Sequence, residues 1–240
     1  MFNMVNKEEL LREYPYKIEL HLHTMPASTC GKVPTEEAMR VFGESGYNAV
    51  CFTNHLTKSY VKRHGGGKKY FKFIMAEYEN AVSCAQNYGM RVYLCCELRF
   101  EKESFNDYLL YGLDEKLLTD AINSVDGTLQ NFVENVKDPR TFLVQAHPFR
   151  DGMDRVDPNL LDGVEAFNMH FNHNNRPAHA RRWADEAKKP VTMGTDFHDP
   201  DEHDYCATRF KTLPVDSFGV ADVLRGGEYI MQVGSSVILP

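Results

Sequence analysis

The segment Tyr16–Gly31 reads YKIELHLHTMPASTCG, and apolar and polar residues alternate along its first half. Because side chains on a strand repeat with period two, the aliphatic residues fall on one face and His21 and His23 on the other. Pro26 follows in a loop, since proline disfavours a central strand. Both imidazoles are therefore predicted to point the same way from the carboxyl end of a strand, where they can form half of a transition-metal site. The alternative is a solvent-facing strand end that carries two histidines by coincidence.

Length and composition narrow the class of protein. The chain has 240 residues, of which 42% are hydrophobic, 12% aromatic and 25% charged. These values differ from those of a disordered chain, and a single α/β barrel of this length is ordinary. We therefore expect one domain over residues 1–240. The net charge of −7 and the absence of a long basic run argue against nucleic acid as a partner, and the cationic patch KRHGGGKK (62–69) is predicted to be a mobile loop.

Nothing in the sequence predicts export or membrane insertion. The N-terminal residues 1–17 are charged from Lys7 onward and lack an apolar signal core, and no apolar run approaches the length of a membrane span. The six cysteines form no CxxC pair and most stand in apolar runs. Buried, reduced thiols in a cytoplasmic protein are therefore expected.

Apolar runs of strand length alternate with longer amphipathic segments. This alternation predicts an α/β fold with a parallel sheet, either doubly wound or closed into a barrel. The segment 34–46 has typical helix punctuation, because Pro34 and two glutamates open it and Gly46 closes it. The predicted strands are 16–21, 48–54, 91–97, 107–113, 141–147, 163–168 and 190–196, and the predicted helices are 34–46, 70–89, 128–138 and 177–189.

Five of the predicted strands end in residue types that bind transition metals. Functional residues of α/β folds gather at the carboxyl ends of parallel strands, so we expect these side chains to meet. A single histidine such as His55 is usually a hydrogen-bonded structural residue, but five such strand ends together favour a metal centre. The candidate ligands are His21, His23, His55, Glu97, His147, Asp196 and His198.

The same residues lie in an ordered set of motifs. The motifs ELHLHT, FTNH, CCELRF, AHPFR, GVEAFN and GTDFH follow one another between Glu19 and His198. In this order the chain resembles the polymerase-and-histidinol-phosphatase (PHP) superfamily of metal-dependent phosphoesterases. The resemblance implies a distorted (β/α)7 barrel that holds two or three divalent metal ions at the carboxyl ends of its strands. Each of the seven candidate ligands falls on a ligand position of that family.

The donor set indicates the chemistry. Imidazoles with carboxylates suit zinc, manganese or iron better than calcium. Two such ions about 3.5–4 Å apart can clamp a phosphoryl group and activate a water nucleophile. Glu97 is the candidate bridging carboxylate, Asp196 the second catalytic carboxylate, and Glu19 is expected to orient the histidine pair. Arg150 and Arg176 are candidates for binding the phosphate of a small phosphomonoester.

The chain departs from the family pattern at two places. Family members commonly carry an aspartate or histidine shortly after the histidine pair, where this chain offers Thr29 and Cys30. Many also carry a histidine in the strand after the glutamate, where Leu109 stands. Further histidines in the segment MHFNHNNRPAH are expected at the rim of the site or at a helix start; they are His170, His173 and His179.

These departures keep alternative functions open. A metal-dependent hydrolase of a non-phosphate substrate such as an amide is one, because related barrels use similar metal centres for amides. A partly degenerate, metal-binding regulatory domain is another. The sequence leaves the identity of the substrate and the oligomeric state open.

Overall fold

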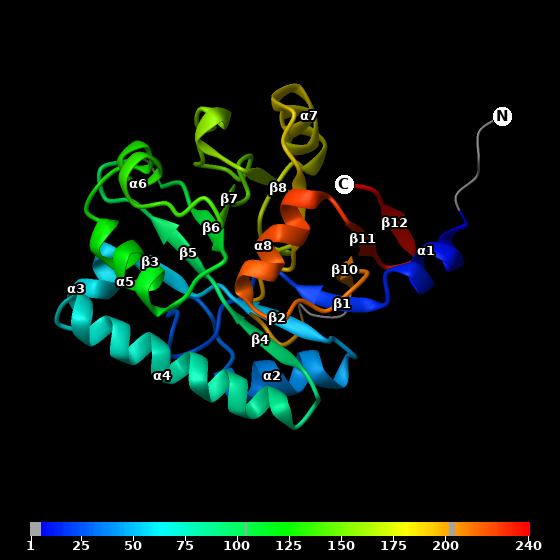
Figure 1. The fold of residues 1–240 in the computed structure, drawn as a ribbon, viewed down its shortest axis with the longest axis horizontal. Coiled ribbons are helices and arrows are strands. Elements are labelled where there is room, and N and C mark those ends of the chain that lie inside the picture. Colours follow the sequence, from blue (N-terminus) through cyan, green and yellow to red (C-terminus); the bar gives the residue numbers. More distant parts are fainter. Residues whose placement is uncertain (1–5, 104, 202–204) are drawn as a thin grey trace.

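The computed structural model describes residues 6–103, 105–201 and 205–240, so residues 1–5 of the N-terminal segment lie outside the described part (Figure 1). Helices and strands alternate along most of the chain, as the sequence predicts. The helices are α1 (Lys7–Glu13), α2 (Thr35–Glu44), α3 (Lys58–Arg63), α4 (Gly67–Gln86), α5 (Glu115–Ser124), α6 (Leu129–Asn135), α7 (Pro177–Ala187) and α8 (Ser217–Gly226), with a 3₁₀ turn at Pro158–Leu160. The strands are β1 (Tyr16–Glu19), β2 (Ala49–Phe52), β3 (His55–Thr57), β4 (Arg91–Leu94), β5 (Cys96–Arg99), β6 (Tyr108–Tyr111), β7 (Phe142–Gln145), β8 (Gly163–Asn168), β9 (Val191–Gly194), β10 (Cys206–Phe210), β11 (Tyr229–Val233) and β12 (Ser236–Ile238).

The strands form two six-stranded sheets. The first has the order β12-β11-β10-β1-β2-β4 and the second the order β3-β5-β6-β7-β8-β9. The predicted strand 91–97 is divided between the sheets, because β4 continues as β5 after Cys95. The predicted strand 48–54 contains β2, and the chain continues beyond it, after Thr53 and Asn54, as β3 in the other sheet. The sheets are therefore joined where two chain segments pass from one to the other.

The ends of the two sheets also meet beyond β1 and β9. The amide of His23 donates to the carbonyl of Phe197 at 2.9 Å, and the amide of Phe197 donates to the carbonyl of His21 at 3.2 Å. The seven predicted strand segments thus follow one another as neighbours, and the last is bonded back to the first. The expected α/β class is confirmed, in the form of two mixed sheets whose ends are linked by the bridge between Leu22 and Phe197.

One strand runs against the predicted direction. β6 pairs antiparallel with both β5 and β7, whereas a parallel sheet was expected. Only residues 100–107 connect β5 to β6, and a parallel crossover needs a dozen or more residues. The start of β6, rather than its end, therefore lies at the carboxyl ends of its parallel neighbours.

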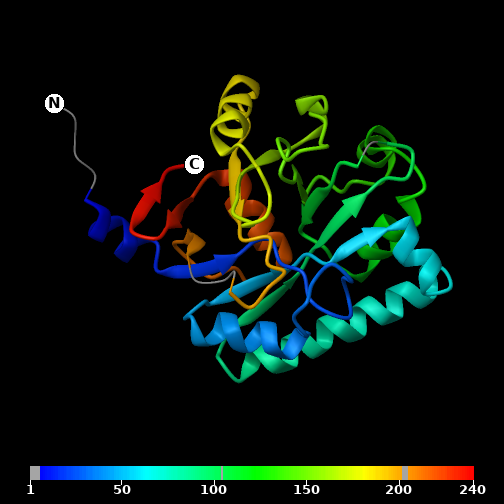
Figure 2. The same ribbon diagram turned by 180° about the vertical axis from the view of Figure 1, so that it is seen from behind.

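Helices α2 and α4 lie together along one side of the sheets (Figure 2). Ala38, Met39 and Phe42 of α2 are buried, and they belong to the same core cluster as Val50 and Phe52 of β2. Helix α8 packs against β6 and β7 and contributes Val220, Ala221 and Leu224 to the second core cluster. The patch 62–69, predicted as a loop, is largely helical, because α3 ends at Arg63 and α4 begins at Gly67.

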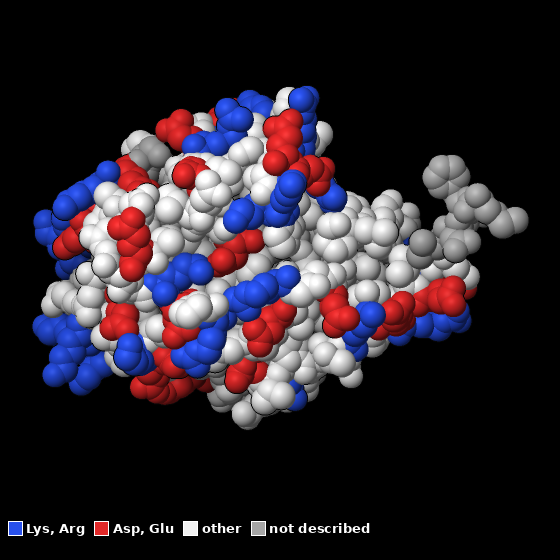
Figure 3. Space-filling model, turned by 45° about the horizontal axis from the view of Figure 1, so that its top comes forward, with Lys and Arg blue, Asp and Glu red and all other residues white. Residues whose placement is uncertain are grey.

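Several elements were not predicted from the sequence. These are α1, α3, α5 and α8, together with β10–β12, which extend the first sheet beyond β1 by antiparallel pairing. Lysine and arginine side chains are interspersed with acidic ones on the face shown in Figure 3. In the described ranges, every helix is too short or too polar to cross a membrane.

Candidate metal centre

The two histidines of the opening segment lie side by side at the end of β1. Both side chains are buried, and their Nε2 atoms are 3.1 Å apart. Side chains of the segment between β2 and β3 hold this backbone in place: Thr53 Oγ1 accepts from the amide of Leu22 at 2.8 Å, and Asn54 Oδ1 accepts from the amide of Thr24 at 2.9 Å. The backbone that carries the two histidines is therefore held by hydrogen bonds to these two side chains.

Two buried carboxylates face the histidine pair. Glu97 Oε1 lies 3.3 Å from His21 Nε2, and Glu97 Oε2 lies 3.2 Å from His23 Nε2. Asp196 Oδ1 lies 3.4 Å from His21 Nε2 and 3.3 Å from His23 Nε2. Donors about 2.1 Å from a tetrahedral ion are about 3.4 Å from one another, so these four side chains have the spacing of ligands to one ion.

The remaining predicted ligands surround the two carboxylates. His55 Nδ1 lies 2.8 Å from Glu97 Oε2, and His147 Nε2 lies 3.3 Å from Glu97 Oε1. His198 Nδ1 lies 2.6 Å from the backbone carbonyl of Asp196, which favours protonation there and leaves Nε2 to bind a metal. The structure therefore brings all seven sequence-predicted ligands into one cluster.

The backbone at two of these residues is strained. His147 and Asp196 adopt positive φ angles of 30° and 53°. Non-glycine residues held in this region cost of order 1–3 kcal/mol and cluster at functional sites. Both residues follow the ends of strands, β7 and β9, where the chain turns so that their side chains reach Glu97 and the histidine pair.

Buried polar atoms without hydrogen-bond donors show that the residues fit metal ions. Within the described part of the chain, neither oxygen of Glu97 accepts a hydrogen bond, although imidazole nitrogens lie 2.8–3.3 Å away. Nδ1 of His55 and of His147 are likewise buried without partners. A buried carboxylate without donors is costly, and divalent ions between these oxygens and nitrogens would remove that cost.

The charges of the cluster favour ionised carboxylates. Burial raises the pKa of Glu97, but the charges of His55 and His21 outweigh it and hold the pKa well below its usual range. The pKa of Asp196 is lowered in the same way, with burial opposed chiefly by His21. Burial lowers the pKa of His21, but Glu165 and the two carboxylates raise it well above its usual value. Both carboxylates are therefore anionic and suited to bind cations.

Glu165 holds His21, a role that the sequence analysis assigned to Glu19. Glu165 Oε1 lies 2.8 Å from His21 Nδ1, and Oε2 accepts from the amide of His147 at 3.0 Å. Glu19 instead accepts from the backbone amides of His21 at 2.7 Å and Thr195 at 2.9 Å. Glu19 therefore holds the backbone of the histidine pair, and Glu165 is the carboxylate that holds a ring. The motif GVEAFN contains Glu165, but nothing in its spacing showed which ring it would meet.

Asp107 is a further acidic residue at the site that the sequence analysis missed. It precedes β6, and its carboxylate groups with His55 and Glu97. Arg99 Nε and Nη2 donate to its two oxygens at 2.7 and 2.6 Å, and Arg150 Nη2 lies 3.6 Å away. A strand assumed to be parallel would have placed Asp107 at the opposite end, so its position could not be predicted without the direction of β6.

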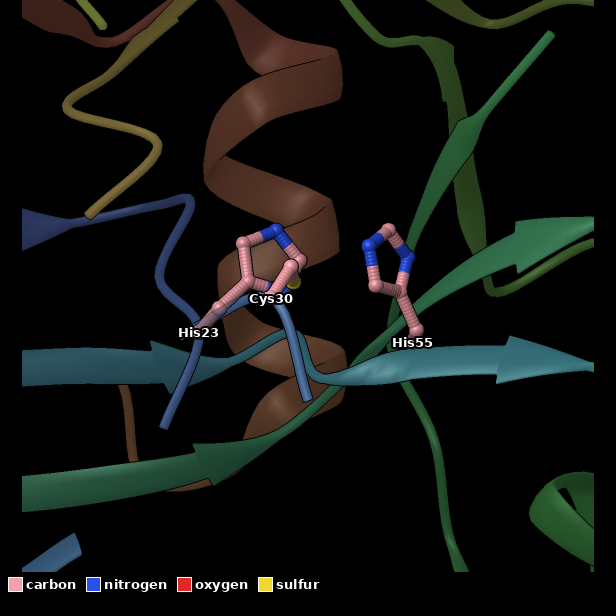
Figure 4. A group of neighbouring side chains, drawn as sticks. All are labelled: His23, Cys30 and His55. Carbon is pink, nitrogen blue, oxygen red and sulfur yellow. The ribbon is translucent and has the colours of Figure 1, made fainter. Parts of the chain in front are cut away.

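The structure separates the two alternatives for the donor after the histidine pair. The hydroxyl of Thr29 lies 2.8 Å from the hydroxyl of Tyr60. The thiol of Cys30 groups with His23 and His55, and Figure 4 shows its sulfur between the two rings. Burial raises the pKa of this thiol, but the charge of His23 and contacts with His198 and His55 lower it to about 5.

The cysteines divide into two kinds. Cys30 is exposed, which corrects the expectation of buried thiols at this position. The others lie away from the metal-ligand groups, and all six are free thiols. Cys51, Cys95, Cys96 and Cys206 are buried, and Cys84 is partly buried.

The histidines that follow β8 lie at different depths. His173 Nδ1 is buried 3.6 Å from Asp196 Oδ2, while the side chain as a whole is 26% exposed, as expected at the rim of the site. The ring of His170 stacks on that of His173 with centroids 3.9 Å apart. His179 lies in the first turn of α7, as expected.

One arginine at the site was not among the two predicted, while the predicted Arg150 lies 3.6 Å from Asp107. A cavity of about 300 Å³ adjoins Cys30 and His55, and Arg99 lines it. Arg150 and Arg176 line a separate hollow formed by the loop after β7, where Arg176 pairs with Asp151 at 2.5 Å. Arg99 is therefore the arginine that shares a cavity with the metal-ligand cluster.

Comparison with known proteins identifies the fold. No family model and no curated protein sequence matches the chain. Among solved structures, PsfC from Pseudomonas syringae PB-5123 superimposes with a TM-score of 0.61 at 17% identity, covering 84% of each chain. A two-domain protein from Bacteroides vulgatus that contains a predicted PHP-like metal-dependent phosphoesterase gives a TM-score of 0.62 at 15% identity, covering 92% of this chain.

A third similar structure is the lesion-specific endonuclease EndoQ from Pyrococcus furiosus, with a TM-score of 0.58 at 14% identity over 88% of this chain. This chain spans 66% of the length of the Bacteroides protein and 56% of the endonuclease. The chain therefore has the fold of PHP-like metal-dependent phosphoesterases. The resemblance seen in the ordered motifs is confirmed at the level of the fold.

Proposed function

We propose that residues 1–240 form one domain that acts as a metal-dependent phosphoesterase, with a small phosphomonoester as substrate. One observation carries this proposal: Glu97 is buried, each of its oxygens faces different imidazoles, and neither oxygen accepts a hydrogen bond within the described residues. A carboxylate in that position has the geometry to divide its oxygens between two cations.

The chain's own residues supply at least two places for a cation. His21, His23, Glu97 and Asp196 surround one, and His55 and Asp107 group with Glu97 at another. When bound, two divalent ions polarise a phosphoryl oxygen and lower the pKa of a water nucleophile. The protein contributes by fixing the ligand rings, as Glu165 does for His21.

Arg99 is the proposed binding residue for the phosphate. Its Nε and Nη2 are held by Asp107, and within the described part of the chain Nη1 has no hydrogen bond. The side chain lines the cavity beside Cys30 and His55, so a phosphate there would lie between a fixed guanidinium and the metal ligands. This geometry favours Arg99 over Arg150 and Arg176, which the sequence had suggested.

The surface supports a small substrate. The net charge is −7, and the exposed basic residues in Figure 3 alternate with acidic ones instead of forming a continuous track for a polyanion. A reducing, cytoplasmic location would suit the free thiols. Hydrolysis of an amide and a regulatory domain without turnover are the competing functions.

A screen with three substrate classes tests the proposal. Purified protein is incubated with generic phosphomonoesters, phosphodiesters and amides, each with added Mn²⁺ or Zn²⁺, and the double variant His21→Ala/His23→Ala serves as the matched control. We expect metal-dependent phosphate release from monoesters that the control lacks. Turnover of amides alone, or no turnover in a protein shown to bind metal, would overturn it.

A further inference from the structure

The segment 28–32 is fastened on both sides of Cys30. Ser28 Oγ accepts from the amide of His55 at 2.8 Å, and the amide of Thr29 donates to the hydroxyl of Tyr60 at 2.7 Å. On the other side, the amide of Lys32 donates to the carbonyl of His198 at 2.9 Å. Two of these anchors are the candidate ligands His55 and His198 themselves, so the thiol is placed relative to their rings.

Gly31 allows the segment to approach the histidine pair closely. A Cβ atom at this position would lie 3.0 Å from the carbonyl oxygen and 3.1 Å from the carbonyl carbon of His23. Any larger residue would therefore push the segment away from the site. The close approach brings the Cys30 sulfur within 4.8 Å of a ring nitrogen of His23 and of His55. Figure 4 shows these three side chains.

The rings around the thiol converge on the same space. The ring of His23 stacks on that of His55 with centroids 4.4 Å apart and lies 4.6 Å from that of His198. A second, independent observation points to a cation here: Glu97 Oε2 is buried without a hydrogen-bond donor and lies 2.8 Å from His55 Nδ1. Cys30 and the unsatisfied carboxylate of Glu97 thus have His55 as a common neighbour.

We propose that Cys30 is a metal ligand which, with His55 and His198, makes a thiolate site that prefers zinc and differs in metal preference from the carboxylate-rich site of His21, His23 and Asp196. The inference rests on the proposed metal-dependent function. A thiolate is a soft ligand that favours zinc over manganese and magnesium, whereas carboxylates accept the harder ions. The two parts of the centre therefore hold different ions when both metals are supplied.

Cobalt titration tests the ligand directly. Metal-free protein is titrated with Co²⁺ while the near-ultraviolet thiolate-to-cobalt charge-transfer band is recorded. We expect the band in the parent protein and in the control Cys84→Ser, whose thiol lies on α4 away from the cluster, and its loss in Cys30→Ser. Cobalt bound without the band, or a band that persists in Cys30→Ser, overturns the inference.

Two further measurements use the same proteins. In the parent, Zn²⁺ but not Mg²⁺ is expected to block the reaction of the exposed Cys30 thiol with a thiol reagent. A reaction rate that Zn²⁺ leaves unchanged overturns the inference. This measurement needs no variant, so it does not depend on whether a variant folds. In Cys30→Asp, zinc affinity is expected to fall by at least about tenfold relative to manganese affinity. Loss of a residue that only supports a metal ligand already lowers metal affinity by about that factor. Phosphate release without the thiolate band would support the proposed function and overturn the inference about Cys30. The band without turnover would support the inference and overturn the proposed function.

Discussion

Glu165 Oε1 lies 2.8 Å from Nδ1 of His21, and this contact fixes the ring that faces both buried carboxylates. The other oxygen of Glu165 accepts from the amide of His147, so one carboxylate orients parts of two candidate ligands. Such outer partners set the tautomer and basicity of a metal-binding histidine.

Replacing this carboxylate tests that role. In Glu165→Gln the side chain keeps its shape but loses its charge, so His21 becomes a weaker donor and metal affinity is expected to fall about 10–100-fold. Competitive titration against a chromophoric chelator measures the change. The control is Glu186→Gln, which removes a carboxylate paired with Arg182 on the outer face of α7. Equal affinities in both variants would assign Glu165 no part in metal binding.

Metal content follows from the number of donors. Seven predicted ligands exceed the three or four protein donors that one ion usually takes, so more than one transition-metal ion per chain is expected in protein purified without chelator. Elemental analysis measures it. A chelator is expected to lower the Tm, because a ligand at a thousand times its Kd stabilises the folded state by about 4 kcal/mol. Protein that holds no metal after reconstitution would contradict both statements.

Leu109 marks the place where a donor is missing. It is the direct cross-strand partner of Glu97, so the two side chains lie on the same face of the sheet. Leu109→His is therefore expected to add an imidazole beside Glu97 and to strengthen binding of an ion held by Glu97 and His147, which isothermal titration measures. Leu109→Met keeps the apolar volume and is the matched control. Identical isotherms for the two variants would mean that position 109 does not reach the ions.

Glu19 gives the metal-free protein a pH-dependent stability. Burial raises the pKa of its carboxyl from 4.5 to about 7 in the folded state, against hydrogen bonds from His21 and Thr195 that lower it. The folded state then binds the proton more tightly, so the contribution is fully present below pH 4.5 and is lost as the pH rises through 7. Relative to Glu19→Gln, the parent is expected to lose about 3 kcal/mol of unfolding free energy between pH 4 and 8. Denaturant titrations of both proteins at the two pH values measure this difference, and parallel pH profiles would refute it.

Arg99 and Arg176 allow the proposed phosphate contact to be separated from general charge. Arg99→Lys keeps the positive charge and the pairing with Asp107 but removes the planar fork, so kcat/KM for a phosphomonoester is expected to fall about 10–100-fold, the equivalent of one or two charged hydrogen bonds. Arg176→Lys, which changes an arginine paired with Asp151, is expected to leave kcat/KM within about twofold of the parent. A larger loss of kcat/KM in Arg176→Lys than in Arg99→Lys would indicate that the phosphate binds at the loop after β7 instead.

Much of the fold could be predicted because its signals are local. The seven apolar runs mark the strands that surround the centre, and the residues at their ends meet as expected. Helix α2 was found for the same reason, since Pro34 and Gly46 bracket it. The direction of β6 was not predictable in this way, because an apolar run has the same pattern in either direction, and Asp107 was missed as a result.

The roles of the outer residues depended on contacts between distant segments. Glu19 and Glu165 are both acidic residues on strands near the site, and only the packing of β1 against β8 and β9 shows that the second meets the ring of His21. Arg99 was overlooked for a related reason, because its place in the cavity depends on Asp107 eight residues later in the chain. Pairings of this kind arise from tertiary structure and leave no periodic trace in the sequence.

The division of β2 and β3 at Thr53 and Asn54 has a consequence for the motions of the histidine pair. Leu22 and Thr24 donate their amides to these two side chains instead of to a neighbouring strand. Hydrogen exchange at the two amides is therefore governed by rotation of a threonine and an asparagine side chain, and not by opening of a sheet. The amide of His23 itself donates to the carbonyl of Phe197, so three successive amides next to the centre report on three different contacts.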